Sequence, residues 1–138
     1  MEGGVERCQE IADFGGVQPS LDIHGNTVVM VYHSRLQCEL KSLVGTINEG
    51  RTTISWGEEV SLVAAKGIYP SISVNAQGDV VKSHQNKFFR SIWRVWGRVQ
   101  NQQIEWKANS LTSATFGEYP TLSLADDGYV VEAFRLLP

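Results

Sequence analysis

Apolar and polar residues alternate along this chain in short runs with a period of two. The clearest apolar pairs, each separated by one polar residue, are Leu21/Ile23, Ile72/Val74 and Leu122/Leu124. This alternation is typical of half-buried β-strands, and Gly- and Asn-containing turns separate the runs. No window of a dozen residues carries an apolar stripe of helical period. The pattern therefore predicts an all-β chain of short, hairpin-connected strands.

One phrase recurs three times along the chain, at residues 16–23, 67–74 and 117–124. Each copy runs from a glycine to a proline and then to an apolar–polar–apolar strand. The prolines Pro19, Pro70 and Pro120 are 51 and then 50 residues apart. A fixed period of this length indicates an array of one supersecondary unit.

The likeness continues after each proline. Fourteen residues after the three prolines come His33, His84 and Phe134, which we take as equivalent positions. A glycine follows in the first two repeats, Gly45 after Val44 and Gly97 after Val95-Trp96, and then comes an Ile-x-Trp strand that ends at Trp56 or Trp106. The expected repeat is therefore four strands in about 50 residues.

Four short strands per repeat are typical of a β-propeller blade, and the β-trefoil lobe is the alternative. The phrase Pro-Ser-apolar-x-apolar, a glycine turn and then Val-Val resembles the opening of blades in sialidase-like and lectin propellers. It is also similar to bacterial and fungal lectins built from near-identical blades, and the likeness covers residues 16–135. The sialidase Asp-box (Ser-x-Asp-x-Gly-x-Thr-Trp) is absent, and so is the Gln-x-Trp signature of trefoils.

The repeats do not fill the 138 residues with a whole number of units. We expect one repeat domain over 1–138, with a terminal blade strand at 5–18, full repeats at 19–69 and 70–119, and a partial repeat at 120–138. Fewer than three blades cannot close a ring, since propellers have four to eight. A propeller would then be completed by homo-oligomerisation, or the sequence is a piece of a longer repeat protein, whereas a trefoil would close as a single chain.

Composition narrows the classes of partner. The net charge of −3 argues against a nucleic-acid binder, and no stretch approaches the ~20 apolar residues of a membrane helix. Residues 1–7 are polar and acidic, which predicts a cytoplasmic protein or one exported without a classical signal peptide. Cys8 and Cys38 have no metal-ligand spacing, and either two free thiols or one disulfide remains open.

Candidate binding residues come from aromatic and polar positions. The tryptophans Trp56, Trp93, Trp96 and Trp106 could either pack in the core or stack on a sugar ring. Trp93 and Trp96 are three residues apart on one strand, so one is expected to be buried and the other exposed. The resemblance to lectin propellers implies inter-blade sites lined by polar residues as well, which adds His33, His84, Gln85, Glu132 and Arg135.

Signals for catalysis are weak. Glu58-Glu59 and Asp126-Asp127 are adjacent pairs in turns, and the chain lacks a nucleophile elbow and a phosphate-binding glycine loop. The leading hypothesis is a non-enzymatic, carbohydrate-binding, lectin-like homo-oligomer without metal or cofactor. A protein–protein interaction scaffold is the second hypothesis, and a glycan-processing enzyme is the third.

Overall fold

The computed structural model describes residues 16–35, 37–62, 66–86, 88, 90–110 and 112–136. Strands and turns make up this part of the chain, with one 3-10 turn, η2 (Ala108–Ser110), so the all-β prediction is confirmed. The strands are β1 (Gly16–His24), β2 (Thr27–Ser34), β3 (Glu39–Ile47), β4 (Ile54–Trp56), β5 (Val60–Ser61), β6 (Gly67–Val74), β7 (Asp79–Asn86), β8 (Ser91–Gln100), β9 (Gln103–Trp106), β10 (Thr112–Leu124) and β11 (Val130–Leu136). The predicted strand before residue 16, and Cys8, lie outside the described residues.

The strands form two antiparallel sheets, and neither closes on itself. The first has the order β1-β2-β3-β4 with β5 also on β3, and the second has the order β11-β10-β8-β7-β6 with β9 on β8. Strand β10 serves two repeats, because its first part pairs with β8 and its second part with β11. We therefore name β1–β5 unit 1, β6–β9 with residues 112–116 unit 2, and residues 117–136 unit 3.

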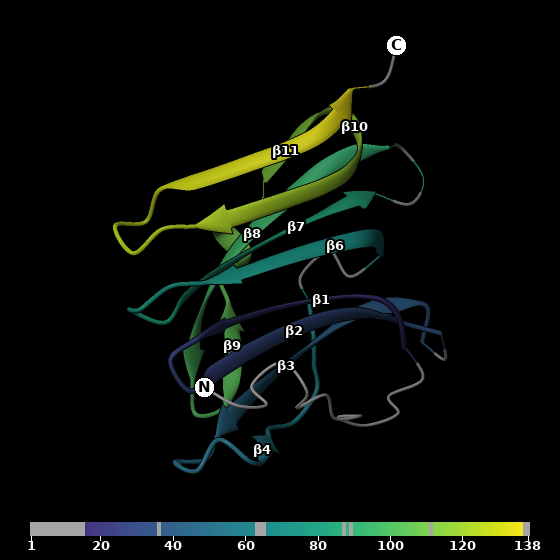
Figure 1. Ribbon diagram of the computed structural model, residues 1–138. Helices are drawn as coiled ribbons and strands as arrows, with labels where there is room; N and C mark the ends of the chain where they lie inside the picture. The colour runs from purple at the N-terminus through teal and green to yellow at the C-terminus, as the bar shows by residue number, and fades with distance from the viewer. Residues whose placement is uncertain are drawn as a thin grey trace, which may run out of the picture.

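The first strands of the units lie next to one another. Figure 1 shows unit 1 in purple and blue, with β1 beside the teal β6 of unit 2. The second part of β10 in turn lies beside β6. The repeated Pro-Ser phrase therefore brings three equivalent strands together in space.

The core of the described residues lies between units 1 and 2. Unit 1 contributes Val29, Val31, Leu40, Val44 and Leu62, and unit 2 contributes Ile72, Val74, Val80 and Ile104. All nine are buried, from 0 to 5% exposed. Apolar residues of period two thus face the neighbouring unit, which explains the alternation seen in the sequence.

A glycine and an aromatic ring mark the start of every unit. The glycine–ring pairs are Gly16–Tyr32, Gly67–His84 and Gly117–Phe134. A Cβ on any of these glycines would lie between 2.1 and 2.6 Å from its ring, so no larger residue fits without rearrangement. The first glycine of the repeated phrase is therefore required by a ring that packs on the backbone.

Hydrogen bonds connect the first strands of adjacent units through side chains. Ser20 Oγ accepts the N–H of Ile72 at 3.2 Å, and Ser71 Oγ accepts the N–H of Leu122 at 3.1 Å. Two residues further on, Asp22 Oδ2 accepts the N–H of Val74 and Ser73 Oγ accepts the N–H of Leu124. We call this the inter-unit ladder, and it explains the polar residues one and three positions after Pro19 and Pro70.

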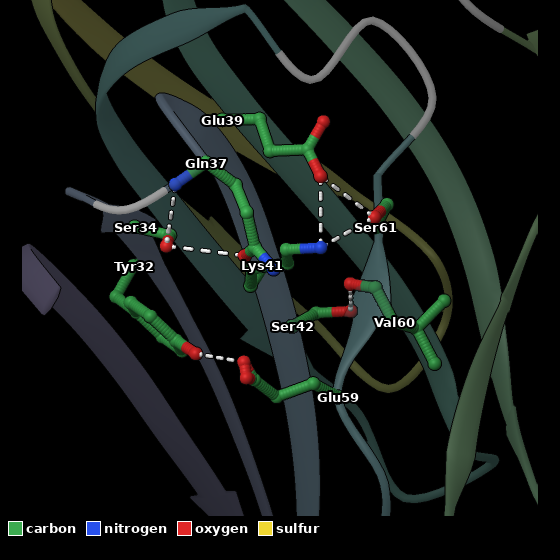
Figure 2. A network of polar contacts seen from close by, with 9 residues as sticks. All are labelled: Tyr32, Ser34, Gln37, Glu39, Lys41, Ser42, Glu59, Val60 and Ser61. Carbon is green, nitrogen blue, oxygen red and sulfur yellow. Dashed lines mark hydrogen bonds and ion pairs between the residues drawn. The ribbon is translucent and has the colours of Figure 1, made fainter. Parts of the chain in front are cut away.

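Unit 1 also has a polar outer edge, where β5 lies on β3 (Figure 2). The Lys41 ammonium group, on a buried residue, donates to Ser61 Oγ and pairs with the Glu39 carboxylate, both at 2.8 Å. Lys41 lowers the pKa of Glu39 through this contact. Tyr32 donates its hydroxyl to Glu59, and burial followed by this carboxylate raises the pKa of Tyr32.

Candidate functional site

Trp56 and Trp106 occupy equivalent places and pack within the fold. A Cβ on Gly45 or Gly97 would lie within 3.0 Å of the tryptophan ring on the adjacent strand, which explains the glycine opposite the tryptophan of each Ile-x-Trp strand. Trp56 packs on Met30, Tyr32 and Leu43. Trp106 packs on the core between units 1 and 2 and donates its Nε1–H to Ser42 Oγ of unit 1 at 3.2 Å. These contacts favour the packing interpretation for both rings.

Trp93 and Trp96 lie on opposite faces of β8, as their spacing predicts. Trp93 is opposite His84 and Trp96 is opposite Val81 in the register with β7. Both are half-buried, so the expectation of one buried and one exposed ring is wrong. Trp93 donates its Nε1–H to Ser91 Oγ at 2.9 Å, and the backbone N–H of Trp96 donates to Ser110 Oγ. A ligand contact at either ring stays a prediction.

The expected equivalence of His33 and His84 is wrong by one residue. His33 pairs with Val17 whereas Gln85 pairs with Ile68, so Gln85 is the counterpart of His33. The positions of His84 and Phe134 correspond to Tyr32 instead. The cause is the first hairpin, whose turn is one residue shorter than the turns of units 2 and 3.

His84 is buried against a lysine. It is 1% exposed, and its Nδ1 lies 2.6 Å from Lys82 Nζ, where Lys82 is 0% exposed. Burial lowers the pKa of Lys82 to about 7, and burial together with the adjacent ammonium lowers the pKa of His84. Lys82 pairs with Ile72, and both residues share with His84 the face of unit 2 that packs on unit 1. His84 therefore lies on the interface face of unit 2 rather than in an open site.

Glu132 and Arg135 are each held in ion pairs. Arg94 Nε of unit 2 lies 3.0 Å from both carboxylate oxygens of Glu132 in unit 3, and Arg94 Nη2 donates to the same carboxylate. The Glu132 side chain is only 8% exposed, so this pair joins two units. Arg135 pairs with Glu118 and lies over the ring of Tyr119, 5.3 Å from its centroid. Gln85 accepts the N–H of Tyr119 at 3.4 Å.

An open hollow of about 280 Å³ forms where the three units meet. Its lining is Gln18, Pro19, Tyr69, Pro70, Tyr119 and Pro120, the same two positions from each unit. We call it the tyrosine hollow. The rings of Tyr69 and Tyr119 meet edge to face with centroids 4.6 Å apart, and Tyr119 is 50% exposed. Aromatic rings from two units thus meet at this opening.

A strained bulge presents the lining residues of the tyrosine hollow. The register of the first strand with the second strand shifts at the same place in every unit. Gln18, Tyr69 and Tyr119 there have φ values of 54°, 52° and 56°, a left-handed conformation that is uncommon for residues other than glycine. Strain of this kind concentrates at functional sites, and here it recurs three times.

Polar groups surround the two rings. Gln18 Oε1 accepts the N–H of Tyr69 at 2.9 Å, which leaves the amide NH₂ of Gln18 as a donor beside the hollow. The nearby Tyr119 phenol is the main cause that raises the pKa of Tyr69. Arg135 adds a cation over the ring of Tyr119.

Sequence reasoning missed Tyr69, Tyr119 and Gln18 as site residues. The signal was present, because a large residue stands directly before each repeated proline in a position that proline restricts. The residues before the three prolines occupy equivalent positions, so they come together once the first strands of the repeats are neighbours.

Comparisons with protein-family models, with curated proteins and with solved structures found no match to this chain. The described residues contain no cluster of three or more His, Cys, Asp or Glu side chains placed to hold a metal ion. In the same part of the chain, no helix has the length and apolar character needed to cross a membrane. The resemblance to lectin propellers and the non-enzymatic hypothesis stay predictions.

Proposed function

We propose that the protein is a non-enzymatic carbohydrate-binding protein and that the tyrosine hollow is its sugar site. The observation that carries this proposal is the pair of aromatic rings, Tyr69 and Tyr119, at an open concavity with polar groups around it. Sugar sites combine aromatic faces, which cover the C–H face of the ring, with a few polar groups that hold hydroxyls. The lectin-like hypothesis thus moves from the tryptophans to the tyrosines.

A pyranose would bind with its apolar face on the exposed ring of Tyr119. The Gln18 amide and the Tyr69 hydroxyl would then donate to sugar hydroxyls, and the Glu118–Arg135 pair would lie at the margin. Prolines 19, 70 and 120 form a rigid wall because their φ angles are fixed. A shallow site of this kind binds weakly, and avidity comes from several copies.

We also infer that the units are propeller blades. A four-stranded antiparallel meander is the blade of a propeller, and the first strands of blades line the central channel. Unit 1 has this strand order, and the three first strands lie side by side with their ladder between them. The tyrosine hollow would then lie at one mouth of the channel.

The test is a glycan array followed by calorimetric titration of each saccharide that binds. Replacement of Tyr119 by alanine is expected to weaken binding about tenfold, the equivalent of one lost stacking contact. Tyr69→Ala is expected to have a similar effect. Tyr129→Ala is the matched control, because Tyr129 is 70% exposed in the β10–β11 turn and outside the hollow. The proposal fails if no saccharide binds or if Tyr129→Ala weakens binding as much as Tyr119→Ala.

One observation favours the alternative of a protein-interaction scaffold. Phe116 and Leu136 are 66% and 67% exposed, and Leu136 pairs with Gly117 beside Phe116. Exposed apolar neighbours of this kind mark protein-binding surfaces. A protein partner whose binding is lost in Phe116→Ser, together with silence on the glycan array, would support the scaffold.

A further inference from the structure

Unit 1 presents an open face whose counterparts in units 2 and 3 are covered. Leu21 and Ile23 are 54% and 46% exposed. The register gives their counterparts in unit 2 as Ile72 and Val74, which are 3% and 4% exposed against unit 1. We call the face of unit 1 that carries Leu21 and Ile23 the front face.

In unit 3 it is the opposite face of the sheet that is exposed. Val131 is 62% exposed, whereas Val29 and Val81 in the same register position are each 0% exposed. Ala133 is also exposed, and its counterpart Val31 is 0% exposed in the core between units 1 and 2. We call the face of unit 3 that carries Val131 the back face.

The inter-unit ladder has unused ends on these same two faces. The hydroxyl groups of Thr121 and Ser123 stand where Ser71 and Ser73 accept N–H groups from the next unit. Both residues are exposed in unit 3. At the front face, Leu21 and Ile23 hold the places of Ile72 and Val74, whose N–H groups are the ladder donors. The N–H of Ile23 donates to Asp22 Oδ1 of its own strand at 2.9 Å. The back face thus ends in acceptors, and the N–H of Leu21 stands at the donor position of the front face.

We propose that the back face of unit 3 binds the front face of unit 1 in a second copy of this chain. The contact continues the interfaces that already join units 1 to 2 and 2 to 3, with the same register positions on each side. It is head-to-tail, because two different faces meet, and such contacts produce rings when the rotation closes. The proposal does not depend on sugar binding, although a closed ring would repeat the tyrosine hollow around one axis.

The first experiment is the solution mass of the purified protein over a range of micromolar concentrations, by light scattering or native mass spectrometry. The proposal predicts a mass that is a multiple of the 15.3 kDa chain. Val131→Asp on the back face and Leu21→Asp on the front face are each expected to reduce the wild-type assembly to monomers. Both side chains are exposed, so the monomers are expected to keep the circular dichroism spectrum of the wild type. A wild-type protein that remains a monomer overturns the proposal.

Mixing the two variants tests the head-to-tail geometry itself. A Val131→Asp copy keeps its front face and a Leu21→Asp copy keeps its back face, so an equimolar mixture forms one intact contact. The expected product is a heterodimer that grows no further, which native mass spectrometry resolves. If each variant alone forms dimers, or if the mixture stays monomeric while both variants are folded, the two faces do not bind each other.

Phe88→Asp is the control for loss of an exposed apolar residue. Phe88 is 68% exposed and lies in the β7–β8 turn of unit 2, whereas the front face belongs to unit 1 and the back face to unit 3. It is expected to leave the mass of the assembly unchanged. A loss of assembly in Phe88→Asp as well would mean that general surface hydrophobicity causes association, and the proposal would be wrong.

Discussion

Replacement of Lys82 by methionine is expected to stabilise the protein at neutral pH and to remove a pH dependence. Lys82 is 0% exposed between units 1 and 2, where its amine contacts His84 Nδ1. Its counterpart in unit 1, paired with Leu21 as Lys82 is paired with Ile72, is Met30. Removing the amine also removes one hydrogen bond to His84, which costs about 1 kcal/mol at every pH.

The sign follows from the proton balance. Burial lowers the pKa of Lys82 from 10.5 to about 7 in the folded protein. Between these values the unfolded chain binds one more proton than the folded protein, so the free energy of unfolding rises with pH. The wild type has its full free energy of unfolding above pH 10.5, and it loses stability as the pH falls towards 7. A difference of this size amounts to about 2 kcal/mol between pH 7 and pH 9.

The assay is urea unfolding followed by tryptophan fluorescence at pH 7, 8 and 9, at one protein concentration for both proteins. From pH 7 to pH 9 the free energy of unfolding of the wild type should rise by about 2 kcal/mol relative to that of Lys82→Met. The reason is that folding of the wild type releases the Lys82 proton, whereas methionine has no proton to release. A double variant combines Lys82→Met with His84→Phe, because unit 3 carries Phe134 at the position of His84. It also removes the His84 nitrogen that Lys82→Met leaves without a partner, so it should be the most stable of the three proteins at pH 7. Parallel stability curves for the wild type and Lys82→Met would refute the buried, partly neutral lysine.

Two further predictions concern the repeat itself. Gly67→Ala should destabilise the protein by about 2–3 kcal/mol, since its Cβ would lie 2.1 Å from the buried His84 ring, whereas Gly25→Ala meets no neighbour and should cost only the strain of its positive φ. Ser73→Ala should cost about 1–2 kcal/mol because it leaves the N–H of Leu124 without its acceptor. Ser123→Ala, the same position on the open back face, should change monomer stability by less than about 0.5 kcal/mol. Equal effects of Ser73→Ala and Ser123→Ala in chemical denaturation would contradict the ladder.

The phrase that recurs every 50 residues predicted the strands within each repeat, because hairpins depend on residues that are close in the sequence. Alternating apolar residues and turn residues determine hairpins without reference to the rest of the chain. The same reasoning misplaced His33 because a turn one residue shorter shifts every later position, and a shift of one residue moves a side chain to the opposite face. Pairing data were needed to match Tyr32 with His84.

The site was harder to predict than the fold. The tryptophans attracted attention as large aromatic residues, yet Trp106 lies on the core between two units and donates to Ser42. The tyrosines of the hollow become candidate site residues only when the three first strands lie side by side and a bulge turns Tyr69 and Tyr119 towards one opening. Neither condition follows from a single repeat.

The most direct test of the sugar site is a nuclear magnetic resonance titration of ¹⁵N-labelled protein with the saccharide that binds most tightly on the array. The account predicts that the largest amide shifts occur at Gln18, Tyr69 and Tyr119, which line the tyrosine hollow. Shifts centred on Trp93 and Trp96 instead, with the hollow unchanged, would contradict it.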